Sequence, residues 1–292
     1  MPGLHAYALA AGLLSVAGLW CFADPLRDLW ALWTQDPLRS IGILIPPASA
    51  WLALRAWRPG DWSRGGTCWG LGLMIAAMGL ARLSADGPLT LQLMTASGTA
   101  AINLIPTGVT LSAYVSGAVL LFGGWCAWRR ARFALLLLVL VNPVPGVLNT
   151  WADLPLQALA ARSARAFAAA LNVPVDGNAL KLMFAPNLGM FIAPGCDGLY
   201  GAATMGVLAL IVGHLRALPM TRHALYVFGA VAVAYSCNLL RLCGVVIYYW
   251  FALRIPAIAD YGTEADYLIG GAVFFLAAAF LFSFPRLGRS HA

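Results

Sequence analysis

Residues 223–250 read HALYVFGAVAVAYSCNLLRLCGVVIYYW, and Arg241 is the only lysine, arginine, aspartate or glutamate among these 28 residues. About 20 mostly apolar residues are enough for a helix to cross the hydrocarbon core of a bilayer. The stretch therefore predicts a transmembrane helix. A charge inside such a helix is costly, so it marks a functional or a paired site by default.

Seven further stretches have the length and composition of membrane spans. Over the 292 residues, 61% are hydrophobic and 10% are charged, with a mean hydropathy of +0.80. A soluble domain carries roughly a quarter charged residues, so lipid must solvate most of this surface. We expect an all-α polytopic membrane protein with about eight transmembrane helices, the first of which lacks the features of a cleaved signal peptide. The expected spans are 4–22, 41–57, 66–84, 108–128, 133–150, 199–215, 223–250 and 266–284.

The basic residues lie between the apolar runs, which argues against nucleic acid as the partner of this chain with a net charge of +7. Basic residues mark cytoplasmic loops. With the amino terminus in the cytoplasm, 10 of the 18 basic residues fall on the inner side, and Asp61 is the only acid there. This topology places both termini in the cytoplasm and leaves out the polar segment 89–105, which we interpret as a re-entrant or surface helix. The inner arginines are 55, 58, 64, 129, 130, 132, 216, 222, 286 and 289.

One sizeable extracytoplasmic segment, residues 151–198, interrupts the series of spans. Its first part, Trp151 to Asn172, is amphipathic and predicts an interfacial helix. Turn signals then flank Ala179 to Ala185 and predict a short hairpin. We find no internal repeat, so we treat residues 1–292 as one integral membrane domain, with 151–198 leading into Cys196.

Cys196 lies in the turn Pro194-Gly195-Cys196-Asp197-Gly198, just before an apolar run that begins at Leu199. A thiol reacts as its thiolate, and a guanidinium or a helix amino terminus nearby lowers its pKa. The plainer interpretation is a buried structural cysteine. No CxxC pair or metal-ligand spacing occurs among the cysteines, so we expect neither a metal nor a cofactor.

Two other groups fall near the outer ends of the last spans. Arg241 lies one helical turn after Asn238, so both can face the same way; alternatively it reaches the interface or ties helices together. Asp266 could cap a helix, orient Arg241 or act as a base. The four histidines all fall on or near the predicted inner side.

At these residues the chain resembles the exosortase/archaeosortase family of membrane cysteine transpeptidases. The resemblance covers most of the chain, in ordered motifs. These are Asp36-Pro37 with Ser40-Ile41-Gly42 and Pro46, Asn142 to Pro145, Leu154 to Gln157, Val173-Pro174-Val175 with Gly177, Cys196-x-Gly198, Asn238-x-x-Arg241 and Asp266-x-x-x-Gly270.

The resemblance implies a thiolate nucleophile at Cys196 and a cation at Arg241 that stabilises it or the oxyanion, with Asn238, Gly198 and Asp197 in support. The implied substrates are secreted proteins with a C-terminal sorting signal made of a short motif, a membrane helix and a basic tail. The chain departs from the family pattern where Asp266 replaces the usual histidine, Ile41 replaces another histidine and Asp197 replaces a serine. Asp266 would then act as the base or orient Arg241, or the chain would be an inactive relative.

We therefore predict an exosortase-like enzyme of a bacterial inner membrane that forms a thioester at Cys196 on the periplasmic side and transfers the product to an acceptor. The alternative is a non-catalytic binder or chaperone for single-span proteins. A transporter ranks third, because polar residues would then be spread along several helices.

Overall fold

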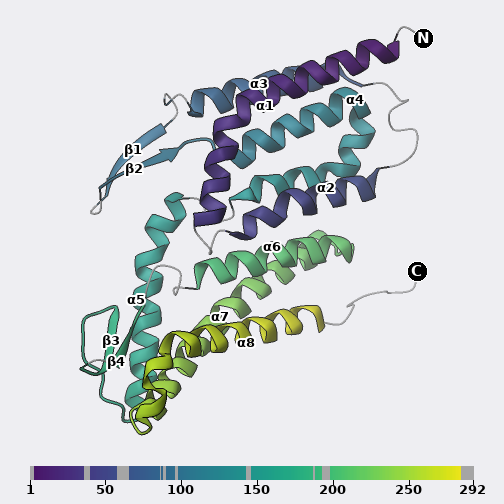
Figure 1. The fold of residues 1–292 in the computed structure, drawn as a ribbon. Helices are drawn as coiled ribbons and strands as arrows, with labels where there is room; N and C mark the ends of the chain where they lie inside the picture. Colours follow the sequence, from purple (N-terminus) through teal and green to yellow (C-terminus); the bar gives the residue numbers. More distant parts are fainter. Residues whose placement is uncertain are drawn as a thin grey trace, which may run out of the picture. The chain divides into compact units, whose positions relative to one another are not determined.

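A computed structural model describes residues 3–35, 40–57, 66–85, 87, 90–95, 98–142, 146–186, 188–192 and 198–283. The chain divides into two compact units, Met1–Pro145 (unit 1) and Gly146–Ala292 (unit 2). Helices dominate each unit (Figure 1). This architecture agrees with the predicted class of an all-α, multi-pass membrane protein.

Unit 1 holds four α-helices, two 3-10 helices and one β-hairpin among its described residues. In chain order they are α1 (Gly3–Gln35), η1 (Ser40–Leu44), α2 (Ile45–Ala56), α3 (Cys68–Ala85), β1 (Thr90–Thr95), β2 (Gly98–Asn103), α4 (Thr107–Leu137) and η3 (Leu138–Val141). Unit 2 contains α5 (Gly146–Ala170), β3 (Lys181–Ala185), β4 (Leu188–Phe191), α6 (Leu199–Leu215), α7 (Met220–Ala252), η4 (Pro256–Tyr261) and α8 (Gly262–Ser283).

Within the described ranges, four helical stretches are long and apolar enough to cross a membrane: Cys68–Ala85, Thr107–Val141, Met220–Ala252 and Pro256–Ser283. Two shorter apolar helical stretches, Ser40–Ala56 and Leu199–Leu215, accompany them. Large apolar side chains such as Leu13, Phe228 and Phe275 are exposed on these units, as lipid contact requires. The count of eight spans remains a prediction.

Helix α4 folds back on itself at Gly124, whose φ of 70° and ψ of −174° interrupt the helix. The Ser112 hydroxyl donates to the Leu135 carbonyl at 2.7 Å, although 23 residues separate them. A straight helix would hold these residues about 35 Å apart. The chain therefore reverses inside an apolar run, because Gly124 adopts a positive φ at no steric cost.

This reversal corrects two predicted spans. The turn between them lies at Gly124 and not at the arginines, which lie in the second arm of α4. The predicted span 133–150 is also wrong as one element, because η3 ends at Val141 and α5 begins at Gly146. Hydropathy alone located the apolar residues but not the point where the backbone turns.

Within the segment 89–105, residues 90–95 and 98–103 form paired β-strands and not the re-entrant or surface helix that we predicted. Strands β1 and β2 are antiparallel, with Thr90 opposite Asn103 and Thr95 opposite Gly98. Polar and apolar residues alternate from Thr90 to Leu93, which is the period of a strand, and this signal outweighs the overall polarity of the segment.

Two sets of contacts distinguish the two ends of unit 1. At one end, the Arg82 guanidinium lies 3.4 Å from the Asp24 carboxylate, and the Trp33 indole donates to the Val141 carbonyl at 3.0 Å. At the other end, Arg55 occupies the last turn of α2, near the start of α3, where the Thr67 amide donates to the Leu120 carbonyl at 3.0 Å. Asp24 and its partner Arg82 thus lie at the opposite end of unit 1 from Arg55.

Unit 2 is organised along α7, which has 33 residues and a length of about 50 Å, longer than the roughly 30 Å of a hydrocarbon core. Its first half packs against α6 and α8, with Met205, Ala234 and Leu281 in the core. Its second half packs against α5 and the β3–β4 hairpin, with Leu182 and Val246 in the core. Figure 1 shows the hairpin beside α5. The predicted amphipathic helix is therefore present as α5, and the predicted hairpin is present with its second strand beyond Ala185.

Candidate functional site

The candidate site centres on an ion pair between Arg241 on α7 and Asp266 on α8. Arg241 Nε donates to Asp266 Oδ1 at 2.8 Å, and Arg241 Nη2 donates to Asp266 Oδ2 at 2.5 Å. The two side chains are 21% and 32% exposed, so the pair is partly shielded from solvent. A bidentate pair holds a guanidinium in one plane. Arg241 is thereby fixed in orientation.

Arg241 lies where α7 passes from the first core of unit 2 to the second. It follows Met220 by 21 residues, which places it about 32 Å along the helix, or about one hydrocarbon thickness. Its neighbour Leu242 is 1% exposed within the core formed with α5 and the hairpin. The cation therefore marks the boundary between the two packed halves of α7.

Asp266 does not cap α8, which was one of the roles that the sequence allowed for it. Helix α8 begins at Gly262, so Asp266 lies in its second turn. Gly270 follows one turn later on the same face. A Cβ atom at Gly270 would lie 3.2 Å from both Cδ and Nε of Arg241. A glycine at this position leaves room for the arginine side chain to reach the carboxylate.

Gly198 begins α6 and lies against Asn238. It occupies the N-cap position with φ 85° and ψ −5°, a left-handed conformation that favours glycine. A Cβ atom there would lie 2.9 Å from Asn238 Nδ2 and 3.0 Å from Asn238 Cβ. Because Asn238 lies one turn before Arg241, the start of α6 and the ion pair meet α7 at neighbouring turns.

Cys196 and Asp197, two of the predicted site residues, lie outside the described residues, as do all of 193–197. The described chain stops on one side at Ile192, which is fully buried and whose amide donates to the Leu180 carbonyl at 2.9 Å. It resumes on the other side at Gly198. The site is thus described on both flanks of the predicted nucleophile.

The two described histidines of unit 2, His214 and His223, lie away from the ion pair. His223 Nε2 lies 3.0 Å from the Leu210 carbonyl oxygen, and it precedes Arg241 by 18 residues, or about 27 Å along α7. His214 lies in the last turn of α6, at the opposite end of that helix from Gly198. In the described ranges no group of three or more histidine, cysteine, aspartate or glutamate side chains could hold a metal ion.

Sequence reasoning missed one residue near the site. The Tyr249 hydroxyl donates to the Gly189 carbonyl at 3.0 Å, and the Tyr249 ring stacks on Phe184 with centroids 4.8 Å apart. The only signal in the sequence was the aromatic run at the carboxy-terminal end of α7, which is also typical of an ordinary membrane interface.

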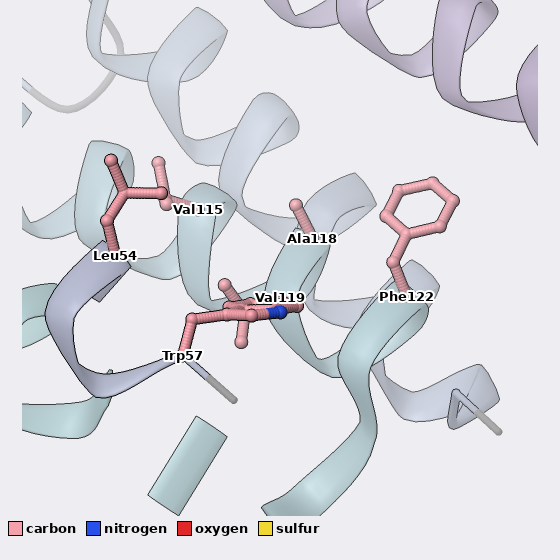
Figure 2. Close-up of a pocket in the computed structure, with 6 residues that line it drawn as sticks. All are labelled: Leu54, Trp57, Val115, Ala118, Val119 and Phe122. Carbon is pink, nitrogen blue, oxygen red and sulfur yellow. The ribbon is translucent and has the colours of Figure 1, made fainter. Parts of the chain in front are cut away.

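An apolar hollow on unit 1 lies between α2 and the first arm of α4 (Figure 2). Leucine, tryptophan, valine, alanine and phenylalanine side chains line it, at positions 54, 57, 115, 118, 119 and 122. None of these groups can act as a nucleophile, an acid or a base, so the hollow adds nothing to the candidate chemistry.

The sequence model of the family described as Transmembrane exosortase (Exosortase_EpsH) matches residues 33–284. This range covers most of the chain and includes Gly198, Asn238, Arg241 and Asp266. No curated protein and no solved structure matches the chain.

Proposed function

Because this chain belongs to the transmembrane exosortase family, we propose that it is a membrane cysteine protease and transpeptidase. Its substrates would be secreted proteins with a C-terminal sorting signal of a short motif, a membrane helix and a basic tail. The observation that carries the proposal is the Arg241–Asp266 ion pair one turn from the Gly198–Asn238 contact.

The location of Gly198 supports Cys196 as the nucleophile. In the sequence, Cys196 precedes Gly198 by two residues, and two residues of chain span at most about 7 Å. Asn238, which Gly198 approaches, is one helical turn from Arg241. A guanidinium near a thiol favours the thiolate, which is the reactive form.

In the proposed reaction, the Cys196 thiolate attacks the carbonyl carbon of the scissile peptide bond. The C–N bond then breaks, the leaving amine takes up a proton, and the acyl group remains on sulfur as a thioester. An acceptor nucleophile attacks the thioester, loses its proton and releases the thiolate. Arg241 would stabilise the negative charge on the oxygen of each tetrahedral intermediate.

The ion-pair geometry favours an orienting role for Asp266 over that of a base. Both of its carboxylate oxygens accept hydrogen bonds from Arg241. A general base needs to reach the proton that it abstracts, whereas an orienting carboxylate needs only to fix the cation. Under this assignment the leaving amine would take its proton from water.

We place the enzyme in a bacterial inner membrane, with both termini in the cytoplasm and the site on the periplasmic side. The distribution of arginines over the predicted loops supports this orientation. In unit 2, Arg216 lies over the ring of Tyr226, 15 residues before Arg241 on α7, and its Nη2 donates to the Phe282 carbonyl at 2.9 Å.

The proposal is tested by Cys196→Ala in the full-length protein, expressed with a protein that carries a sorting signal. Processing of that protein should stop while the abundance of the membrane enzyme stays unchanged. Cys237→Ala and Cys243→Ala are matched controls, because both cysteines are partly buried on α7, and both should process normally. Continued processing by Cys196→Ala would exclude the thioester mechanism.

A non-catalytic binder of single-span proteins is the second candidate. The observation that favours it is that Asp266 already neutralises Arg241, while the two described histidines of unit 2 lie far from the pair. A thiol reagent that does not cross membranes separates the two functions. Labelling of Cys196 faster than an ordinary thiol near neutral pH supports the enzyme, and ordinary or slower labelling supports the binder.

A further inference from the structure

Tyr249 links the outer half of α7 to strand β4. The tyrosine is 7% exposed, and its hydroxyl donates to the Gly189 carbonyl at 3.0 Å. Its ring stacks on Phe184 of β3 at an interplanar angle of 20°. The aromatic ring alone would satisfy the packing, whereas the hydroxyl adds one directed bond to the backbone of β4.

Strand β4 is the last described element before residues 193–197. Gly189 is followed by Ile192, which is fully buried in the core that also contains Tyr249 and Val246. Beyond 193–197, Gly198 meets Asn238. The described residues on both sides of 193–197 therefore contact α7, Gly189 through Tyr249 and Gly198 through Asn238.

These two anchors lie on either side of Arg241 along one helix. Asn238 precedes Arg241 by three residues, which is about 4.5 Å, and Tyr249 follows it by eight residues, which is about 12 Å. A helix keeps such spacings nearly constant. The anchors can therefore set the distance between the cysteine segment and the cation.

We propose that Tyr249 is a positioning residue, whose hydroxyl fixes β4 on α7 and thereby keeps Cys196 at a fixed distance from Arg241. The inference rests on the proposed function in taking Cys196 as the nucleophile. Tyr249 itself touches neither substrate nor thiol in this role. A misplacement of about 1 Å at a reacting group can lower a rate about 100-fold.

The test is Tyr249→Phe in the full-length protein in lipid vesicles, with cleavage of a sorting-signal substrate as one readout. The variant keeps the ring and removes only the hydroxyl. We expect kcat to fall by about 10–100-fold with KM unchanged. The rate of backbone hydrogen exchange at residues 188–192 should rise. The pH dependence of the rate at which a thiol reagent labels Cys196 should also change.

Tyr226→Phe is the matched control. The Tyr226 hydroxyl donates to the Leu281 carbonyl at 2.8 Å, near the opposite end of the same helix. The control loses an equivalent bond and should keep the wild-type kcat and Cys196 labelling profile. Tyr249→Phe is also compared with Tyr248→Phe, which removes a bond to the Ile258 carbonyl and should raise exchange in residues 255–261 instead.

Equal kcat in Tyr249→Phe and Tyr226→Phe would overturn the positioning role. If the wild-type protein cleaves no substrate, the proposed function fails. The positioning role of Tyr249 is then tested by comparing Tyr249→Phe with the wild type in hydrogen exchange at residues 188–192 and in thiol labelling of Cys196. Unchanged exchange at 188–192 together with an unchanged labelling profile of Cys196 would overturn the inference on its own terms.

Discussion

Arg241 and Asp266 come from consecutive helices, lie 25 residues apart in the sequence and form a two-point ion pair through Nε and Nη2 of the arginine. The carboxylate thus stands at the position where the resemblance to the family expects a histidine. A carboxylate carries the negative charge that pairs with a guanidinium, whereas a neutral imidazole does not. Under the proposed function, this replacement would convert a potential proton carrier into a group that orients the cation.

Substitutions of Asp266 should separate the two roles of this residue. We expect Asp266→Ala to lower the cleavage rate by about 100-fold or more, because Arg241 loses its fixed orientation. Asp266→Asn should retain more activity, since its amide oxygen can still accept from the arginine. Asp266→His should preserve some activity as well. Rates are measured with a sorting-signal substrate and purified protein.

The control for Asp266 is Glu264→Gln, a change at an exposed acid in the first turn of the same helix, which should leave the rate unchanged. Equal losses of cleavage rate in Asp266→Asn and Asp266→Ala would instead indicate that Asp266 acts as a base.

Gly198→Ala should impair both stability and cleavage. The substitution forces a side chain into a backbone with φ 85° and to within 2.9 Å of Asn238, and a non-glycine residue in such a conformation costs about 1–2 kcal/mol before any clash. Thermal unfolding in detergent and cleavage assays measure the two effects. Gly201→Ala, where an added Cβ meets nothing within 4 Å, should be neutral or slightly stabilising. A Gly198→Ala protein as stable and active as wild type would contradict the described contact.

Close packing between α3 and α4 predicts a sensitive glycine in unit 1. A Cβ at Gly117 would lie 2.6 Å from Met74 Cγ and 2.7 Å from the Gly70 carbonyl oxygen. Small residues allow such close approach between membrane helices. We expect Gly117→Val to lower the free energy of unfolding by about 1–3 kcal/mol through overpacking. Gly72→Val, with nothing within 4 Å, should change it much less, as monitored by thermal unfolding. Equal losses in both variants would disprove the helix contact.

The proposed orientation predicts opposite accessibility at the two ends of α7. Thr221 in its first turn and Ala257 beyond its last turn are both exposed. In a variant without native cysteines, Ala257→Cys should react with an impermeant thiol reagent added outside intact cells, and Thr221→Cys should react only after the membrane is opened. The reverse result would invert the topology.

Several features of the fold were predictable from the sequence because they depend on local composition. Long apolar runs report directly whether a segment prefers lipid, so the helices α6 and α7 appear almost where they were predicted. The alternation at Thr90 to Leu93 was also a local signal, although the polarity of the segment led to the wrong element. Cys196 was singled out by its turn and by the order of the motifs, and its role remains a proposal.

The sequence by itself determined that this is a helical membrane protein with an arginine, Arg241, inside an apolar helix, because hydropathy and the cost of a charge in lipid need no knowledge of neighbours. Only the tertiary structure decided that Asp266 pairs with Arg241, that Gly198 meets Asn238 and that Tyr249 holds Gly189. It also decided the reversal at Gly124 inside an apolar run. Apolar helices offer many equivalent faces to one another, so which faces meet depends on packing in three dimensions and not on composition.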